Sequence, residues 1–289
     1  MQSDAPGSER LKEGQTRHWN SVASGWDVWF DWTVRNFAPV TDWLRGAAGW
    51  RAGARVLDVG CGTGYPALAA AASVRPGGTV VAVDISPGML AAASRRAIAA
   101  GLDNVEFSVM DAEQLRVPVH SFDGATNAYG LMFCPDAARA VGEMHRALKP
   151  GGSVALVTWD QPSKSPFFSA ISDLAARFLA LPPADPMAPG PFRMASREAL
   201  ESVLARGGFE EISVGSVPAT FECDSVAQYF QIFSDFAWKS RIASLSERDL
   251  ATFKAAVTAA VEPYIHADGR LRLVATSICG SARRPMHLR

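Results

Sequence analysis

The sequence lacks several features that would place it outside ordinary globular proteins. Its 289 residues include only four cysteines, which lie far apart at Cys61, Cys134, Cys223 and Cys279. No C-x-x-C pair occurs, so the cysteines indicate neither a zinc site nor a disulfide framework. No apolar run approaches the roughly 18 residues that cross a bilayer, and residues 1–4 lack the basic and apolar regions of a secretory signal. We therefore predict a cytoplasmic protein with reduced thiols, no metal and no membrane insertion.

An excess of one charge is also missing. The chain has 28 Lys and Arg against 29 Asp and Glu, a net charge of −1, and its basic residues are scattered. Nucleic-acid binding needs a basic footprint. We therefore expect no nucleic-acid partner and a small-molecule ligand instead. A hydrophobic content of 48% over 289 residues is enough for a large core.

Glycines gather at one point of the chain that carries most of the functional information. Residues 56–64 read V-L-D-V-G-C-G-T-G, an apolar strand pattern followed by three alternate glycines. Such glycines let the main chain turn sharply and approach a ligand closely, and a helix is expected to start near Thr63, with its first amides facing the ligand. The spacing differs from the G-x-G-x-x-G dinucleotide fingerprint. Asp58 would repel a pyrophosphate but could hold an ammonium group, directly or through water.

The string hydrophobic-Asp-x-Gly-Cys-Gly-Thr-Gly closely resembles the first motif of class I S-adenosylmethionine-dependent methyltransferases. Later pieces resemble the same family in the same order: a strand ending in Asp84, a strand followed by Asp111, the Phe-Asp start of a fourth strand at 122–128, and L-K-P-G-G at 148–152. The resemblance implies an α/β fold with a doubly wound, seven-stranded, mostly parallel Rossmann-like sheet and a helical cap over the active site. It also implies that a last strand, 271–279, inserts antiparallel between the fifth and sixth.

The resemblance implies S-adenosylmethionine as cofactor and S-adenosylhomocysteine as product. Asp84 lies at a strand end, where an acidic residue binds ribose hydroxyls in doubly wound folds; capping is the alternative, although Ser86 and Pro87 already supply a helix start. Asp111 matches the family position that accepts the adenine amino hydrogens, with capping of a short helix as the alternative. Trp26 could face the sulfonium through cation–π attraction. The expected cofactor-binding residues are Asp58, Gly60, Cys61, Gly62, Gly64, Asp84, Ile85, Met89, Asp111, Ala112, Asn127 and Trp26.

A dense group of aromatic residues precedes the glycine motif. Residues 1–10 are expected to form a flexible tail and residues 11–46 two helices over the cofactor site. Most of their rings are explained by packing alone, but some are candidates for an acceptor pocket, whose expected residues are Trp29, Trp159, Tyr229, Phe230 and Phe233. Candidates for a general base are His18, Tyr129 and His266, each of which also has a plain packing or surface explanation.

We divide the chain into three parts. Residues 1–50 are an N-terminal helical cap segment, 51–160 the S-adenosylmethionine-binding core, and 161–289 the rest of the sheet with helical cover insertions at 161–191 and 224–266. The tryptophan-rich start and the L-K-P-G-G turn most resemble the branch that includes ubiquinone/menaquinone and natural-product methyltransferases.

The expected reaction is in-line methyl transfer to an O, N or C nucleophile of a small, largely apolar or aromatic metabolite. Two alternatives stay open: a protein that binds the cofactor without catalysis, and an NAD-dependent oxidoreductase, which the glycine spacing disfavours. A homodimer is also left open.

Overall fold

The computed structural model describes residues 5–181, 185 and 188–286. One seven-stranded sheet has the order β3-β2-β1-β4-β5-β7-β6. The strands are β1 Arg55–Val59, β2 Thr79–Asp84, β3 Val105–Val109, β4 Phe122–Ala128, β5 Leu148–Trp159, β6 Glu210–Cys223 and β7 Leu271–Arg283. The first five strands in this order, β3, β2, β1, β4 and β5, pair in parallel, whereas β7 is antiparallel to both β5 and β6. The predicted seven-stranded, mostly parallel α/β fold is confirmed, including the inserted antiparallel last strand.

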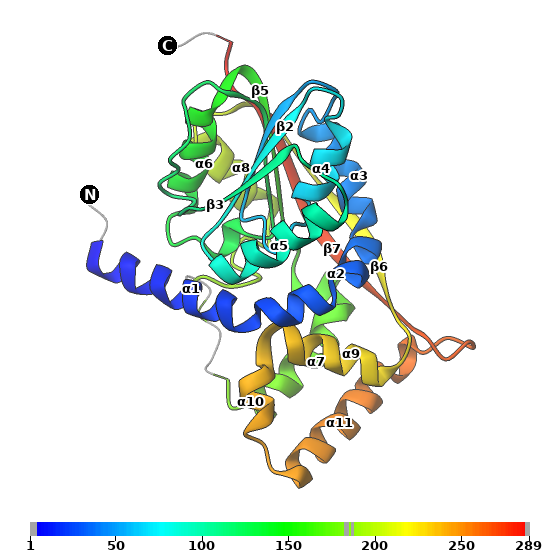
Figure 1. Ribbon diagram of the computed structural model, residues 1–289. Coiled ribbons are helices and arrows are strands. Elements are labelled where there is room, and N and C mark those ends of the chain that lie inside the picture. Colours follow the sequence, from blue (N-terminus) through cyan, green and yellow to red (C-terminus); the bar gives the residue numbers. More distant parts are fainter. Residues whose placement is uncertain (1–4, 182–184, 186–187, 287–289) are drawn as a thin grey trace.

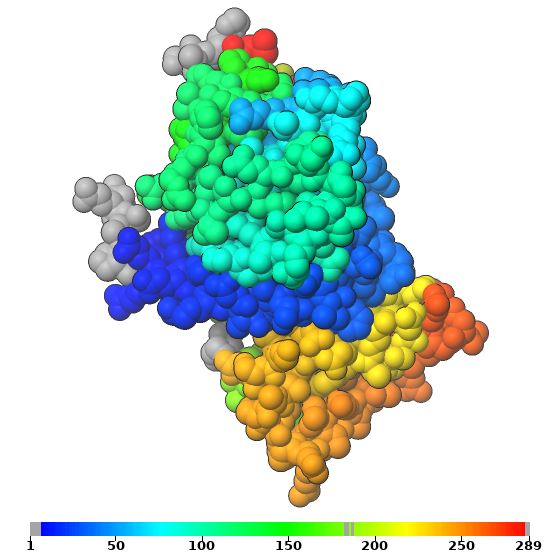
Figure 2. All heavy atoms as spheres, viewed as in Figure 1, coloured from blue at the N-terminus to red at the C-terminus, as the bar shows by residue number. Residues whose placement is uncertain are grey.

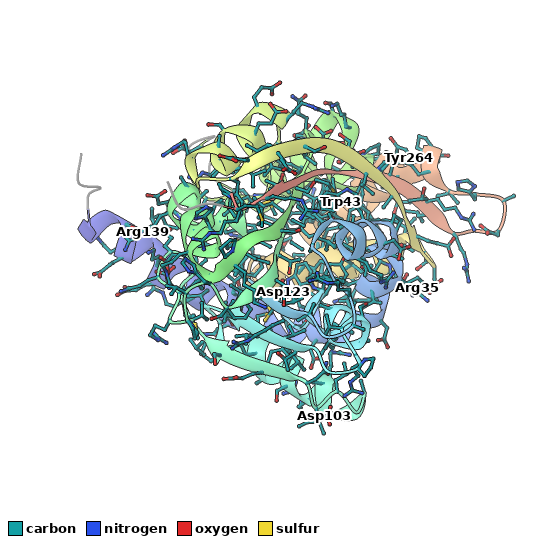
Figure 3. All side chains as sticks on the ribbon, turned by 90° about the horizontal axis from the view of Figure 1, so that it is seen from above. Arg35, Trp43, Asp103, Asp123, Arg139 and Tyr264 are labelled. Carbon is teal, nitrogen blue, oxygen red and sulfur yellow. The ribbon has the colours of Figure 1, made fainter. Side chains whose placement is uncertain are left out.

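Successive apolar residues of the central strands point to opposite faces of the sheet and bury both, as expected for parallel strands covered by helices. Val56 of β1 belongs to the core shared with α3 (Ala38–Ala47) and α4 (Ala67–Ser73). Leu57 belongs to the core shared with α6 (Ala137–Ala147) and α8 (Arg197–Arg206). Helix α5 (Pro87–Ala99) packs on β2 and β3. Seen from above, Asp123 near the start of β4 lies in the middle of the molecule, and Asp103, before β3, at its edge (Figure 3).

The N-terminal segment differs from the prediction in two ways. Residues 5–10, expected in a flexible tail, belong to α1 (Ala5–Val28), because a run of good helix formers, Glu, Arg, Leu and Lys at positions 9–12, follows Pro6; residues 1–4 lie outside the described part. The rest of the segment forms two further helices, α2 (Phe30–Asn36) and α3, where one was predicted. The extra break falls at Phe37, two residues before a proline in the first turn of α3.

Other helix starts follow the predicted caps more closely. The side chain of Ser86 accepts a hydrogen bond from the Met89 amide at the start of α5, as predicted. The helix after the glycine motif, however, begins at Ala67 and not near Thr63. The chain first makes turns that end at Pro66, which has no amide hydrogen to donate.

A layer of helices covers the carboxyl ends of the parallel strands, as predicted for the cap (Figure 1). It comprises α7 (Pro166–Phe178), α9 (Val226–Phe233), a π turn (Ser234–Trp238), α10 (Lys239–Ala243) and α11 (Glu247–Val261). Helix α1 runs as a band between this cap and the sheet (Figure 2). Short 3₁₀ turns lie at Leu131–Phe133, Pro162–Lys164 and Glu262–Tyr264. Among the helices described, none combines the length and the apolar character that crossing a bilayer requires.

Candidate functional site

A cavity of about 440 Å³ lies where α1, the cap and the carboxyl ends of β1, β2 and β4 meet. Its volume is in the range of small-ligand pockets. The chain builds the sheet outward from β1 in one direction through β2 and β3, and in the other from β4. The cavity therefore lies at the topological switch point, where open α/β sheets bind their ligands.

Two sets of lining residues differ in chemistry. The first, which we call the strand-end half, comprises Val59 to Thr63, Tyr65, Asp84, Ile85, Met89, Met110 to Glu113, Asn127 to Gly130, Met132 to Pro135, and Lys12, Gln15, His18, Trp19 and Trp26 of α1. The second, which we call the aromatic half, comprises Trp32, Thr33, Phe37, Trp159, Phe167, Phe168, Ser172, Pro191, Phe192, Phe221, Phe233, Phe236, Ala237 and Trp238.

Asp84 fixes the glycine turn in the strand-end half. One carboxylate oxygen accepts a hydrogen bond from the Gly62 amide at 2.9 Å and the other from the Ser86 amide at 2.8 Å. Burial raises the pKa of Asp84, while these main-chain donors oppose that shift. Gly62 has φ +52°, a Cβ there would meet no protein atom within 4 Å, and the residue lines the cavity. A side chain at Gly62 would therefore project into space that is open to a ligand.

Asn127 and Tyr129 shape the end of β4. The Asn127 amide donates to the Val59 carbonyl at 2.7 Å, and its oxygen accepts from the amides of Gly130 and Leu131. Asn127 thereby ties β4 to β1. Tyr129 has φ +61°, which is uncommon for a residue with a side chain. Its hydroxyl is 2.7 Å from Ser277 Oγ, and burial raises its pKa well above the ordinary value, so the phenol stays neutral.

Sequence reasoning missed an ion-pair cluster in the strand-end half. Lys12 Nζ of α1 lies 2.7 Å from Asp111 Oδ2 and 2.6 Å from Glu113 Oε2. Asp111 Oδ1 also accepts a hydrogen bond from the Glu113 amide at 2.9 Å. No helix starts at Asp111, so the alternative role as a helix cap is wrong. About a hundred residues separate Lys12 from its partners, and no local sequence pattern predicts such a pair.

Helix α1 is also attached to α5 and to the cap. Asn20 Oδ1 accepts hydrogen bonds from Ser86 Oγ and the Gly88 amide, and Asp27 pairs with Arg95 and Arg96. On the cap side, Trp26 stacks on Phe236 with ring centroids 3.9 Å apart, and Gly25 packs directly on the Asp235 backbone. A Cβ at Gly25 would lie 2.2 Å from the Asp235 carbonyl oxygen, so only glycine allows this approach.

The aromatic half is a continuous network of rings. Trp159 stacks on Tyr129 at 4.2 Å and contacts Phe37 and Phe168 edge-on. Phe167 joins Phe221 and Phe233 to the same network. Its two hydroxyl groups, on Thr33 and Ser172, both donate to main-chain carbonyls of their own helices. The aromatic half therefore offers a ligand mainly apolar contact.

Most of the residues predicted from the sequence lie on the cavity wall. The lining includes Trp26, Gly60, Cys61, Gly62, Asp84, Ile85, Met89, Asp111, Ala112, Asn127, Trp159 and Phe233, together with His18 and Tyr129 among the candidate bases. His18 is exposed, and partial desolvation lowers its pKa. Six predicted residues are not part of the lining: Asp58, Gly64, Trp29, Tyr229, Phe230 and His266.

The six residues outside the lining have identifiable positions. Asp58 is fully buried behind the turn, where one carboxylate oxygen accepts from Thr126 Oγ1 at 2.7 Å and the other has no partner in the described chain. Tyr229 and Phe230 pack inside the cap, and the Tyr229 hydroxyl donates to the Phe167 carbonyl. Trp29 donates its indole hydrogen to Asp235.

The remaining two are Gly64, which packs beside Leu68, and His266, which is exposed in the turn before β7. Helical spacing identified buried faces, but it does not distinguish a face on a cavity from a face on another helix.

Comparison with known proteins agrees with this geometry. Residues 56–152 match a family described as a methyltransferase domain. Aklanonic acid methyltransferase DauC of Streptomyces sp. (strain C5) is 41% identical over 106 residues, 37% of this chain and 48% of that protein. Demethylmenaquinone methyltransferase of Geobacillus kaustophilus (strain HTA426) is 41% identical over 111 residues, 38% and 47% of the two chains. The chain thus spans about half the length of the curated relatives it matches.

Solved structures extend the likeness to most of the chain. The [4+2]-cyclase SpnF aligns with a TM-score of 0.54 and 24% identity, covering 86% of this chain and 80% of SpnF. A protein from Bacillus halodurans C-125 aligns with a TM-score of 0.56 and 20% identity, covering 85% and 98% of the two chains. At these identities the likeness establishes the fold alone. Sequence likeness to methyltransferases therefore lies in residues 56–152, and the likeness in fold extends over most of the chain.

Proposed function

We propose that the protein transfers a methyl group from S-adenosylmethionine to an O, N or C nucleophile of a small, largely apolar or aromatic metabolite. The observation that carries this proposal is the composition of one cavity. Its strand-end half offers carboxylates and a glycine turn at the switch point of the sheet, and its aromatic half offers rings. Aklanonic acid and demethylmenaquinone in the names of the relatives support acceptors from natural-product or quinone biosynthesis.

The strand-end half fits the proposed cofactor. Each oxygen of Asp84 holds one main-chain hydrogen bond and keeps further acceptor capacity for a ribose hydroxyl. We assign Asp111 to the adenine amino group and Ala112 to the ring edge, because both line this half of the cavity, and the open space at Gly62 is available to the rest of the molecule. When bound, S-adenosylmethionine supplies a methyl group on a positively charged sulfur. Asp58, enclosed behind the turn, can act on an ammonium group only indirectly.

The protein's own contribution is largely positional. Holding a nucleophile in line with a methyl group contributes on the order of 7–11 kcal/mol. Residues of α1 and of the cap line the cavity from two sides, and Figure 1 shows α1 lying between the cap and the sheet. The division at residues 50 and 160, a cytoplasmic location, the absence of a nucleic-acid partner and a homodimer stay predictions.

A second function deserves a direct test, because the fold does not determine the reaction: SpnF, which shares it, is named a cyclase. Calorimetry with S-adenosylmethionine tests cofactor binding. Release of S-adenosylhomocysteine over a panel of small phenols, indoles, quinols and prenyl compounds tests transfer. Cofactor binding without release from any of these compounds would favour the non-catalytic alternative, and turnover of NADH would favour an oxidoreductase. We expect EDTA to leave transfer unchanged, since no cluster of metal-ligating side chains occurs in the described residues.

A further inference from the structure

The titratable side chains of the cavity are unevenly distributed. Lys12, His18, Cys61, Tyr65, Asp84, Asp111, Glu113, Tyr129 and Cys134 are the titratable residues among those that line it. None belongs to the aromatic half as defined above, which carries no acid, amine, imidazole, thiol or phenol in the described chain. Tyr65 and Tyr129 border the aromatic half through ring contacts with Phe37 and Trp159. An acceptor held among those rings therefore meets only these two phenols, at the edge of the aromatic half.

The titratable groups around the aromatic half are engaged or neutral. Asp84 is bound by two main-chain amides, and Asp111 and Glu113 share the Lys12 ammonium. Burial raises the pKa of Cys134 to about 12, and it raises the pKa values of Tyr65, Tyr129 and Cys61 well above their ordinary values. At neutral pH these phenols and thiols are proton donors. His18 belongs to the strand-end half and is exposed on α1, and its lowered pKa leaves the imidazole neutral, so the kinetic experiment below includes a His18 variant.

Two indoles of the aromatic half, those of Trp238 and Trp159, donate no hydrogen bond to the described chain, and Trp159 is the more deeply buried of the two. Trp159 is 7% exposed, lines the cavity and stacks on Tyr129 at the end of β4. Its indole nitrogen makes no hydrogen bond to the described chain. The indole nitrogens of Trp26 and Trp50 also lack a partner, but they are fully buried, whereas that of Trp159 is not. The Trp159 N–H is therefore an unpartnered donor on a residue of the cavity wall, where the oxygen of a ligand can accept its hydrogen.

We propose that the acceptor enters the aromatic half as the anion of an acidic phenol or enol, that Trp159 Nε1–H binds its oxygen, and that no side chain of the protein removes the proton. This inference rests on the proposed function. The acceptor loses its proton to solvent before binding. Its oxygen, or the conjugated carbon of the enolate, then forms a bond to the methyl carbon while the carbon–sulfur bond breaks and its electron pair stays on sulfur.

The apolar surroundings favour such a step. An anion and a sulfonium cation become a neutral methylated product and a neutral thioether, so the reaction removes both charges from a poorly hydrating environment. Isolated charges are costly among apolar groups, and their loss in the transition state is correspondingly favourable. A donor at Trp159 holds the anion in place, because hydrogen bonds to charged groups are stronger than those between neutral ones.

An equilibrium experiment tests the binding of the anion without turnover. The absorbance of 4-nitro-1-naphthol distinguishes its neutral and ionised forms, so its apparent pKa can be titrated on the protein in saturating S-adenosylhomocysteine. We expect the anion to bind to the wild type, and Trp159→Phe, which keeps a ring on Tyr129, to weaken anion binding about 10- to 100-fold. Trp50→Phe is the matched control, because Trp50 is a buried indole outside the cavity. Failure of the dye to bind, or equal anion affinity in the wild type and Trp159→Phe, would overturn the proposal.

A kinetic experiment tests the absence of a protein base. Across 1-naphthols carrying nitro, chloro or methoxy groups, the midpoint of the pH profile of kcat/KM should follow each naphthol's own pKa and stay in place in His18→Gln. A single midpoint for all naphthols, lost in His18→Gln or Tyr129→Phe, would show a protein base and overturn the proposal. S-adenosylhomocysteine release from any naphthol at the plateau supports the proposed function whatever the midpoint, so the two hypotheses can fail separately.

Discussion

The two halves of the cavity hold their shape in different ways. In the strand-end half, main-chain amides, carboxylates and one ammonium fix each other at hydrogen-bond distance, as Asp84 does with the glycine turn. In the aromatic half, rings from α2, β5, α7, β6 and the π turn fix each other by packing, with centroids about 4 to 6 Å apart. Polar networks lose most when one partner is removed, whereas packed rings tolerate change in proportion to the contact area lost. The halves should therefore respond differently to single substitutions.

The largest effect is expected from Asp84→Ala. The variant removes the carboxylate that we assign to the ribose hydroxyls and also releases the Gly62 amide from its partner. Two hydrogen bonds to a charged group are worth about 1.5–3 kcal/mol each, which corresponds to a loss of cofactor affinity of about 10²- to 10⁴-fold. Calorimetry with S-adenosylmethionine measures it, and Asp103→Ala, at an exposed aspartate, is the control. An unchanged dissociation constant in a folded Asp84→Ala protein would remove Asp84 from the site.

A buried carboxylate behind the strand-end half gives the next effect, which is on stability. Burial raises the pKa of Asp58 from 3.8 to about 7, against an opposing hydrogen bond from Thr126. The folded protein therefore holds a proton on Asp58 that the unfolded chain releases near pH 4, and the stability due to this proton is lost as the pH rises from about 4 to about 7. The full difference is at most about 4 kcal/mol.

Asp58→Asn keeps an oxygen for Thr126 and removes the ionisation. We expect the same melting temperature as the wild type near pH 4 and a higher one above pH 7. Thermal melts across this range measure the difference, and a variant that is equally stable or less stable at pH 8 would contradict the raised pKa.

The strand-end half was largely predictable because its chemistry lies within short stretches of chain. A parallel strand delivers its last residue to the same edge of the sheet as its neighbours, so Asp84 could be placed from its strand pattern. Asn127 was placed through the resemblance of residues 122–128 to the fourth strand of the family. The same argument misplaced Asp58 on the cavity wall, because a residue inside the strand has its side chain among the surrounding elements. Lys12 escaped prediction, since its partners are distant in sequence.

The aromatic half was predictable in composition and not in detail. Trp159 and Phe233, predicted for the acceptor pocket, line the cavity, whereas Trp32, Phe37 and Phe221, which also line it, were not identified. Each lies at a buried position that looks like ordinary core in the sequence. Whether a buried ring borders a cavity or another ring depends on the distance between whole helices. That distance is set by contacts such as Gly25 against Asp235, which the sequence pattern does not reveal.

Substitutions of Phe233 and Trp29 test which rings of this region contact the acceptor. Phe233 lines the cavity, whereas Trp29 holds α1 to the cap through its bond to Asp235 Oδ2, 2.9 Å long. We expect Phe233→Ala to raise the acceptor KM on the order of 10-fold with cofactor affinity unchanged, because one ring face is lost from the contact. Trp29→Phe should lower the melting temperature slightly and leave the acceptor KM unchanged. The reverse pattern would place Trp29 in the pocket and Phe233 outside it.

The smallest effect is expected from Lys12→Met, because its ion pair is partly exposed. The Lys12 and Asp111 side chains are 21% and 28% exposed, and partly exposed pairs contribute up to about 1 kcal/mol. Partial burial lowers the pKa of Lys12, but bonds to Asp111 and Glu113 more than offset this and raise it. The stabilisation of the folded state by this ion pair is therefore complete below the ordinary lysine pKa of 10.5 and is lost only at higher pH.

The variant frees the start of α1 and the carboxylate that we assign to adenine. We expect cofactor affinity to fall about 3- to 5-fold in dilute buffer and by less at high salt, where the wild-type pair is itself screened. Arg17→Met, on an exposed side chain of the same helix, is the control for the loss of one positive charge. If both variants weaken cofactor binding equally, the effect comes from the loss of a positive charge on α1 and not from the ion pair. The ion pair that joins α1 to the sheet is responsible if only Lys12→Met weakens cofactor binding. In that case, Lys12→Met should have no further effect in a protein that already carries Glu113→Gln and Asp111→Asn.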